Sequence, residues 1–370
     1  MIVAKRILFF IVHPSKYYVF RHTINILKGR GHHVDILITS KDVLEDLIKC
    51  ENWDYINIFP EGRKIKGLSP LISSGINFFR TIYRLYKYTK NKQYDLFITD
   101  DLLVFLTKFM NVPSFAFTDD DISVTRQFSI ILSRSTHILA PDITNLGKYN
   151  SKKISFSSYK ELAYLHPNTF VPNKKVVKKI NPDMERYFII RLVSLKAYHD
   201  IFMKGLSNEQ LEKIIKLLET KGRVFISAER GLPIKLHKYQ LKIEPEKIAH
   251  VLYYANLFIG DSQTMTSEAA LLGTPAFRCN DFAGKISVMD EKEEKYGLSY
   301  NYSTKDFNKM YAKLEEVISK KNFKKEFQQK RENMLSDKID LSKFMVWLFE
   351  NYPNSISEYQ KNPFIQYRFR

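Results

Sequence analysis

The chain has 370 residues, of which 44% are hydrophobic and 14% aromatic, so it is long enough to form one large folded domain or two. Its formal charge of +18 favours an anionic partner such as a nucleotide, a nucleic acid or an anionic membrane, without choosing among them. The 2 cysteines, Cys50 and Cys279, are far apart, which argues against a disulfide scaffold and against a zinc site.

Short apolar runs alternate with helical patterns from the N-terminus onward. The pattern predicts strands at residues 7–12, 34–39, 55–59, 96–99, 114–117 and 137–140. This alternation favours a parallel sheet covered by helices, and we expect a first domain at residues 1–157. No G-x-G-x-x-G sequence follows the first strand, so a nicotinamide or flavin site has little support.

The opening apolar run is too short for a signal peptide or a membrane span. It ends after six residues at His13, which favours a buried first strand. No apolar run approaches the roughly 18 residues that cross a bilayer. We therefore expect a cytoplasmic protein, and peripheral attachment to the inner face of the membrane stays open.

Polar side chains follow several of the predicted strands. Doubly wound sheets bind ligands beyond the carboxyl ends of their strands, so these positions are candidates for a site. His13 follows the first strand and is a candidate general base. Asp119 follows the fifth strand and is a second candidate for that role, and Asp100 is a further candidate for contact with a substrate. Each of these residues is also able simply to cap a helix.

Residues 64–92 interrupt the regular alternation with a mixture of aliphatic, aromatic and basic side chains. A helix of this composition is able to lie on a membrane surface or to receive a lipid-linked acceptor. The simpler interpretation, which we favour, is a helix packed on the sheet with a solvated basic face.

The pattern loosens at residues 158–182, where prolines and a lysine cluster predict an interdomain linker that contains Glu161. A second series of strands and helices follows, and we expect a second domain at residues 183–340. A helix and tail at residues 341–370 close the chain. In the second series, Lys196, His199 and Arg230 lie in turns that follow strands.

Residues 257–276 are the most informative stretch of the chain, because they read as a buried strand, a polar turn and a helix that stops at Gly273. The first amides of a helix lack partners and its dipole is positive there, so this unit suits an anion. Ser262, Gln263 and Thr264 add side-chain donors, and Glu268 is able to accept from sugar hydroxyls. A diphosphate beside a ribose fits this arrangement, although the same turn also fits a plain N-cap.

Residues 260–275, GDSQTMTSEAALLGTP, with residues 191–200, 159–167 and 30–34, resemble the nucleotide-sugar half of GT-B glycosyltransferases and of the related hydrolysing UDP-N-acetylglucosamine 2-epimerases. Within that group the chain looks most like the DUF354 family. The resemblance implies an α/β fold of two Rossmann-like domains that face each other across a cleft, with the last helix returning to the first domain. It implies a nucleotide sugar as substrate, no cofactor and no metal ion.

The leading functional prediction is a glycosyltransferase that moves a sugar from a nucleoside-diphosphate sugar to a glycan or lipid-linked acceptor, in cell-surface polysaccharide synthesis. The predicted roles are diphosphate binding by Ser262, Gln263, Thr264, Arg230 and Lys196, ribose binding by Glu268, proton removal by His13 or Asp119, and cleft contacts by Asp100, Glu161 and His199. The alternatives are a nucleotide-sugar 2-epimerase or hydrolase and, ranked lower, a nucleic-acid-binding protein or a non-catalytic nucleotide-sugar sensor. No recognisable RNA-binding motif supports a nucleic-acid partner, so none is expected.

Overall fold

The computed structural model describes residues 3–41, 43–63, 65, 67, 69–194, 205–281 and 283–370. The chain divides into two compact units, one made of Met1–Thr169 with Lys338–Arg370 and the other of Phe170–Asp337. The C-terminal segment therefore belongs to the same unit as the N-terminus. Lys196 and His199 lie outside the described residues.

The first unit is built on a parallel sheet whose strands, among the described residues, run in the order β3-β2-β1-β4-β5-β6-β7. These strands are β1 (Arg6–Ile11), β2 (His33–Ile38), β3 (Ile56–Asn57), β4 (Leu96–Thr99), β5 (Ser114–Phe117), β6 (His137–Pro141) and β7 (Lys153–Phe156). Parallel sheets are covered by helices on both faces, so their central strands are apolar at nearly every position. Leu8 to Ile11 of β1 are accordingly fully buried.

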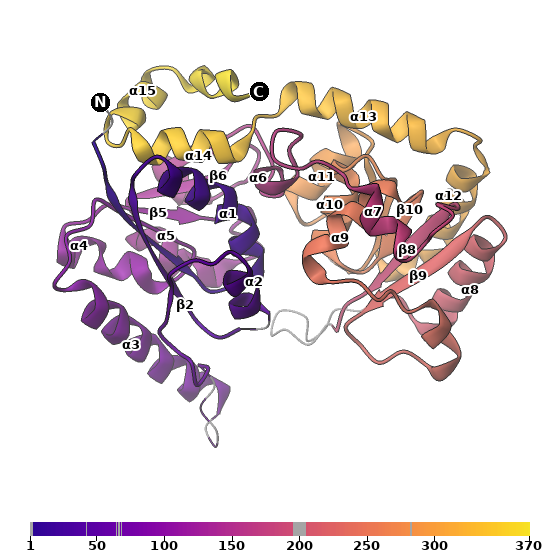
Figure 1. The fold of residues 1–370 in the computed structure, drawn as a ribbon, viewed down its shortest axis with the longest axis horizontal. Helices are drawn as coiled ribbons and strands as arrows, with labels where there is room; N and C mark the ends of the chain where they lie inside the picture. Colours follow the sequence, from indigo (N-terminus) through magenta and orange to yellow (C-terminus); the bar gives the residue numbers. More distant parts are fainter. Residues whose placement is uncertain are drawn as a thin grey trace. The chain divides into compact units, whose positions relative to one another are not determined.

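Helices cover the two faces of the first sheet (Figure 1). The helices of this unit are α1 (Pro14–Gly29), α2 (Leu44–Cys50), α3 (Pro70–Thr89), α4 (Leu106–Met110), α5 (Ser129–Arg134), α6 (Leu162–Leu165), α14 (Leu341–Glu350) and α15 (Asn354–Lys361). Phe9 faces the core formed with α1 and α14, whereas Phe10 faces the core that includes Leu85 of α3. The ring of Phe349 on α14 lies 5.2 Å from that of Phe115, so the C-terminal segment completes this core.

The second unit is built on a smaller parallel sheet in the order β12-β11-β10-β8-β9. Its strands are β8 (Tyr187–Leu192), β9 (Arg223–Ala228), β10 (Leu257–Gly260), β11 (Ala276–Cys279) and β12 (Ser299–Tyr302). Its helices are α7 (Lys174–Lys178), α8 (Asn208–Glu219), α9 (Ile248–Tyr254), α10 (Gln263–Leu271), α11 (Ser287–Glu294), α12 (Phe307–Ser319) and α13 (Phe323–Asp337). The side chains of α8 and α12 pack with Phe188 and Ile190 in one core.

The predicted fold class, α/β with two Rossmann-like sheets, is confirmed. Both sheets are parallel, and each is extended in both directions from a central pair of strands, as doubly wound folds are. Of the helices in the described part of the chain, none combines the length and the apolar character that a membrane crossing requires.

Candidate functional site

The first sheet reverses its winding between β1 and β4, and the loops beyond this pair form the edge where doubly wound sheets bind ligands. Phe10 pairs with Thr99 across these two strands. His13 and Asp100 therefore leave the sheet at neighbouring points of the same edge. Asp119 leaves beside them, because β5 is the next strand along. The fold thus brings together the polar residues that the sequence singled out in this half.

His13 is the N-cap of α1. Its Nδ1 accepts a hydrogen bond from the amide of Ser15 at 3.1 Å. A neutral imidazole that accepts at Nδ1 carries its proton on Nε2. In this geometry the ring is set to donate from Nε2 and is not set to receive a proton there.

Asp119 is buried between two lysines. Its Oδ1 lies 3.5 Å from Nζ of Lys16, and its Oδ2 lies 2.7 Å from Nζ of Lys160. Burial lowers the pKa of Lys160, but attraction by Asp119, Glu161 and Asp120 outweighs it and raises that pKa above its ordinary value. Glu161, a predicted cleft residue, is thus part of the same buried charge cluster. Both carboxylate oxygens of Asp119 are therefore engaged by lysine ammonium groups.

Asp100 and Asp120 differ from Asp119 in their contacts. Each has a buried carboxylate oxygen, Oδ1, that lacks a hydrogen-bond partner among the described residues. Burial raises the pKa of Asp100 to about 6, and Lys16 only partly offsets this effect. Burial, followed by repulsion from Asp119, also raises the pKa of Asp120. Asp100 is therefore able to exchange a proton near neutral pH, which acid–base catalysis requires, and the pKa of Asp120 is shifted in the same direction.

Lys16 is a component that the sequence prediction missed. It lies in the first turn of α1, is 9% exposed and places Nζ 4.8 Å from the ring centre of Phe117. A cation in the first turn of a helix opposes the helix dipole. That unfavourable position, directly after the first strand, is the sequence signal that points to a buried anionic partner.

The second sheet reverses its winding between β8 and β10, and the turn after β10 contains the predicted anion loop. Ser262 is the N-cap of α10, and its Oγ accepts from the amide of Met265 at 3.3 Å. Ser262 therefore has the N-cap role that the sequence also allowed. Gln263 and Thr264 form the first turn beyond the cap and are partly exposed, so their amides lie at the positive end of the helix.

Asp261 ties this loop to the neighbouring strand. Its Oδ1 accepts from the amide of Val193 at 2.7 Å, and its Oδ2 lies 3.6 Å from Nη2 of Arg230. Burial raises the pKa of Asp261 to about 6, partly offset by the Val193 amide and by Arg230. Arg230 also donates to the carbonyl of Leu206 at 2.6 Å. These contacts hold the Arg230 guanidinium at the edge that carries the anion loop.

Glu268 lies one turn after Thr264 on α10, so the two side chains share a face of the helix. The residue is 7% exposed. A carboxylate in this position is able to accept hydrogen bonds from a ligand bound at the start of the helix.

The other end of α10 is fixed by α13. Nε of Arg331 donates to the carbonyl of Leu271 at 2.9 Å, and Nε2 of Gln328 donates to that of Leu272 at 3.0 Å. Gly273 has φ of +69°, which ends the helix at the predicted residue. A cation at this end complements the helix dipole, so α13 anchors the C-terminus of α10.

Comparison with solved structures shows which proteins share this architecture. A UDP-N-acetylglucosamine 2-epimerase from Neisseria meningitidis bound to UDP-GlcNAc is 12% identical, with a TM-score of 0.62 over 95% of this chain and 100% of that one. A putative UDP-N-acetylglucosamine 2-epimerase from Listeria monocytogenes is 10% identical, with a TM-score of 0.63 over 91% and 92% of the two chains. The calicheamicin glycosyltransferase CalG4 is 12% identical, with a TM-score of 0.58 over 95% and 100%.

These similarities establish the fold and not the reaction. The chain has a GT-B-like fold with two Rossmann-like domains, which glycosyltransferases and UDP-N-acetylglucosamine 2-epimerases share. No family model matches the sequence, so the resemblance to DUF354 stays a prediction. No curated protein matches it either.

Proposed function

We propose that the protein is a glycosyltransferase that moves a sugar from a nucleoside-diphosphate sugar to a hydroxyl of a glycan or lipid-linked acceptor. The observation that carries this proposal is the start of α10 at the switch point of the second sheet, with Arg230 and Glu268 beside it. An anion and an adjacent diol are the ligand features that these groups suit.

The donor is assigned to the second unit. The amides of Gln263 and Thr264 and the Arg230 guanidinium would stabilise the diphosphate as it leaves, since its negative charge grows when the bond to the sugar breaks. Ser262 contributes through the cap that shapes this turn. Lys196, predicted from the sequence to add positive charge, keeps that role as a prediction.

Proton transfer is assigned to the first unit. The acceptor hydroxyl loses its proton to a carboxylate, its oxygen bonds to the anomeric carbon, and the bond from that carbon to the diphosphate oxygen breaks. We assign the base to Asp100 in preference to Asp119, because Asp119 is neutralised by Lys16 and Lys160. Asp119 would then position these lysines, and His13 would donate a hydrogen bond from Nε2 to the substrate.

A second candidate is a nucleotide-sugar 2-epimerase or hydrolase. The observation that favours it is the pair of carboxyl groups with raised pKa values, Asp100 and Asp120, because proton removal and return at a sugar carbon require two such groups. This reaction needs no acceptor. Release of free sugar or of an epimer from the nucleotide sugar alone would therefore support it over the transferase.

Replacement of Glu268 by alanine tests the donor site. We expect UDP, GDP or CMP compounds to raise the melting temperature of the wild-type protein selectively, and the variant to bind the same compound about 10- to 100-fold more weakly. Loss of hydrogen bonds to a buried carboxylate has an effect of this size. Thermal shift with a panel of nucleotides and nucleotide sugars gives the selectivity, and titration calorimetry gives the affinity.

Glu315→Ala is the matched control, because Glu315 is an exposed glutamate of the same unit, on α12. Glu268→Gln keeps the side-chain volume and separates lost binding from lost folding. Unchanged nucleotide affinity in both Glu268 variants would remove the ribose assignment. A wild-type protein that responds to no nucleotide would remove the proposed function itself.

A further inference from the structure

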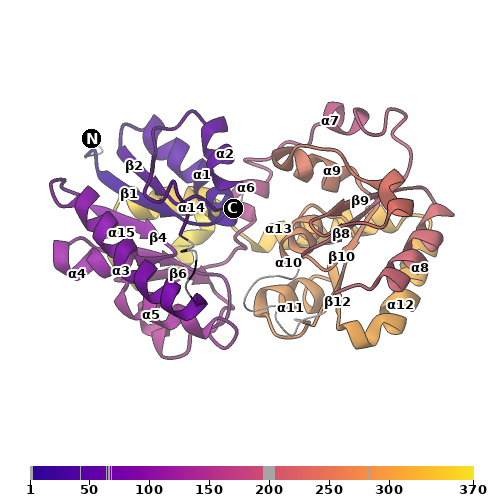
Figure 2. The ribbon, with the colours of Figure 1, turned by 90° about the horizontal axis from the view of Figure 1, so that it is seen from below.

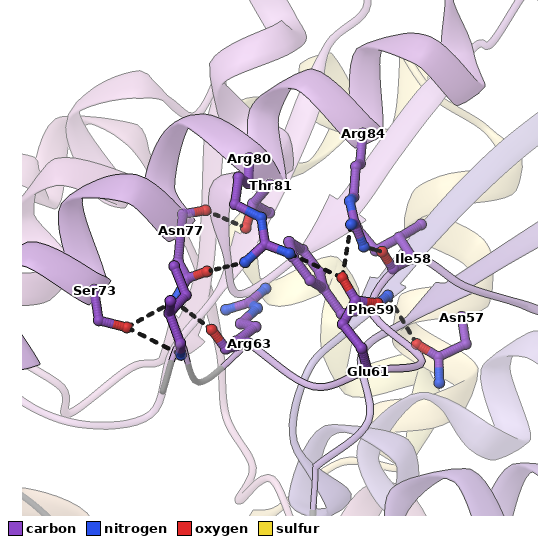
Figure 3. A network of polar contacts seen from close by, with 11 residues as sticks. Asn57, Ile58, Phe59, Glu61, Arg63, Ser73, Asn77, Arg80, Thr81 and Arg84 are labelled. Atoms are coloured by element: carbon purple, nitrogen blue, oxygen red, sulfur yellow. Dashed lines mark hydrogen bonds and ion pairs between the residues drawn. The ribbon is translucent and has the colours of Figure 1, made fainter. Parts of the chain in front are cut away.

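The helix α3 turns its arginines inward, toward the body of the first unit (Figure 3). Arg80 and Arg84 donate to Oε1 of Glu61 at 2.9 and 2.6 Å. The guanidinium carbon of Arg84 lies 4.3 Å from the ring centre of Phe59, and Nη1 of Arg84 donates to the carbonyl of Ile58. The two guanidinium groups on this side of the helix therefore share one carboxylate and are held against the protein.

The same side of α3 carries a line of small and polar residues. Asn77 donates to the carbonyl of Arg63 and to Ser73, as Figure 3 shows. Ser73 and Thr81 are buried. The interpretation that we favoured from the sequence, a helix packed on the sheet with a solvated basic face, holds for the buried Leu85 and for the exposed Lys87 and Lys90. It does not hold for Arg80 and Arg84, which pair with Glu61.

The outward side of α3 is an apolar stripe made of Ile72, Ile76, Phe79 and Tyr83. Their exposed fractions are 54%, 40%, 72% and 65%. Spacings of four, three and four residues place all of them on one face of the helix. Figure 2 shows α3 lying across the first unit in the view from below. Exposed apolar groups that form one continuous face mark an interaction site, whereas single ones do not.

The stripe is continued by α4 and by lysines. Phe109 of α4 is 71% exposed, and its ring centre lies 5.2 Å from that of Tyr86 on α3. Lys87 and Lys90 are exposed one and two turns beyond Tyr83, and Lys108 is exposed beside Phe109. The sequence contains no acidic residue from residue 62 to residue 94. This surface therefore combines apolar side chains with lysines, and its segment of the sequence contains no acidic residue.

We propose that the stripe on α3 is a docking surface for an anionic lipid membrane. Isoleucine and aromatic side chains enter the boundary between headgroups and acyl chains, while neighbouring lysines are attracted to anionic headgroups. A helix that lies in the membrane plane in this way needs no spanning segment. The inference does not depend on the reaction proposed above, because lipid binding is measured without nucleotide or acceptor.

Co-sedimentation of the full chain with vesicles tests the proposal. The probes are vesicles of phosphatidylglycerol and phosphatidylcholine in equal parts, and vesicles of phosphatidylcholine alone. We expect binding to the anionic vesicles that is at least about tenfold stronger than to the neutral ones, since each lysine near such a surface contributes on the order of a factor of five. The double variant Phe79→Ser with Tyr83→Ser should bind the anionic vesicles at least about tenfold more weakly than the wild type.

Two further variants make the outcome decisive. Lys87→Glu with Lys90→Glu should also weaken binding to the anionic vesicles. Val171→Ser with Ile234→Ser, at positions 77% and 86% exposed in the second unit, should leave it unchanged. Binding that resists the Phe79 and Tyr83 changes would overturn the proposal. A wild-type dimer that the same changes convert to a monomer, measured by light scattering, would overturn it as well, because the stripe would then be a subunit interface.

Discussion

Replacing Asp100 with asparagine is expected to lower kcat by about 10²- to 10⁴-fold while the affinity for the nucleotide stays the same. The magnitude is that of losing a positioned general base. Asp100 has a buried Oδ1 without a hydrogen-bond partner among the described residues, at the switch point of the first sheet. The nucleotide is assigned to a different unit, so its binding is measured separately, by titration calorimetry. Turnover is measured with the nucleotide sugar identified by thermal shift.

The pH dependence gives an independent readout of the same group. Burial raises the pKa of Asp100 to about 6 from its ordinary value of 3.8, so the basic form accumulates as pH rises through about 6. We expect kcat to rise over this range and then to level off.

A raised carboxyl pKa also means that the native state binds the proton more tightly than the unfolded state. The corresponding stability is present at low pH and is lost as pH rises from about 4 to about 6.

Asp101→Asn is the matched control for this prediction. Asp101 is adjacent in sequence, but its carboxylate pairs with Arg63 at 3.1 Å and accepts from the amide of Leu102. Asparagine caps a helix about as well as aspartate, so this variant should keep near-normal activity. Asp100→Asn removes a buried charge above pH 6 and should be at least as stable as the wild type there. Full activity in Asp100→Asn would return the base role to Asp119 or His13.

The central strands were predictable from sequence because a parallel sheet with two covered faces requires continuous apolar runs. The strands that escaped prediction have weaker patterns for physical reasons. β7, Lys153–Phe156, and β12, Ser299–Tyr302, each lie at one edge of their sheet and carry polar residues. β11 is interior, but it contains Arg278, which is fully buried and whose pKa burial lowers to about 10.

The sequence was sufficient to predict where the residues of the candidate site lie, but not which chemical role each of them has. Residues after strands converge at a sheet edge by topology alone, so His13, Asp100 and Asp119 were found together. Which carboxylate is neutralised depends on Lys16, which approaches from α1, and on Lys160, which approaches from the turn before α6. The orientation of α3 likewise depends on Glu61, which lies outside the helix and attracts Arg80 and Arg84 inward. Pairings of this kind arise from tertiary structure, and local periodicity does not encode them.

Gly260→Ala is expected to produce the largest loss of stability among the substitutions considered. Gly260 pairs with Arg191 where β8 and β10 meet, and a Cβ atom there would lie 2.3 Å from the carbonyl oxygen of Arg191. The carbonyl oxygen is a backbone atom and the Cβ position is fixed by the backbone, so neither can rotate away. The clash is therefore relieved only if the two strands separate. Overpacking of this kind costs about 3 kcal/mol or more. In a unit of this size such a loss lowers the melting temperature by roughly 6 to 12 °C.

The same substitution should also abolish nucleotide binding, because the turn after β10 sets the start of α10. Scanning calorimetry resolves the unfolding transition of the second unit, and titration with the selected nucleotide is carried out well below that transition. Gly231→Ala is the control, since an added Cβ there would meet nothing within 4 Å and should change stability by at most about 1 kcal/mol. If Gly260→Ala keeps both its melting temperature and its nucleotide affinity, the close approach of β8 and β10 does not determine the geometry of the anion loop.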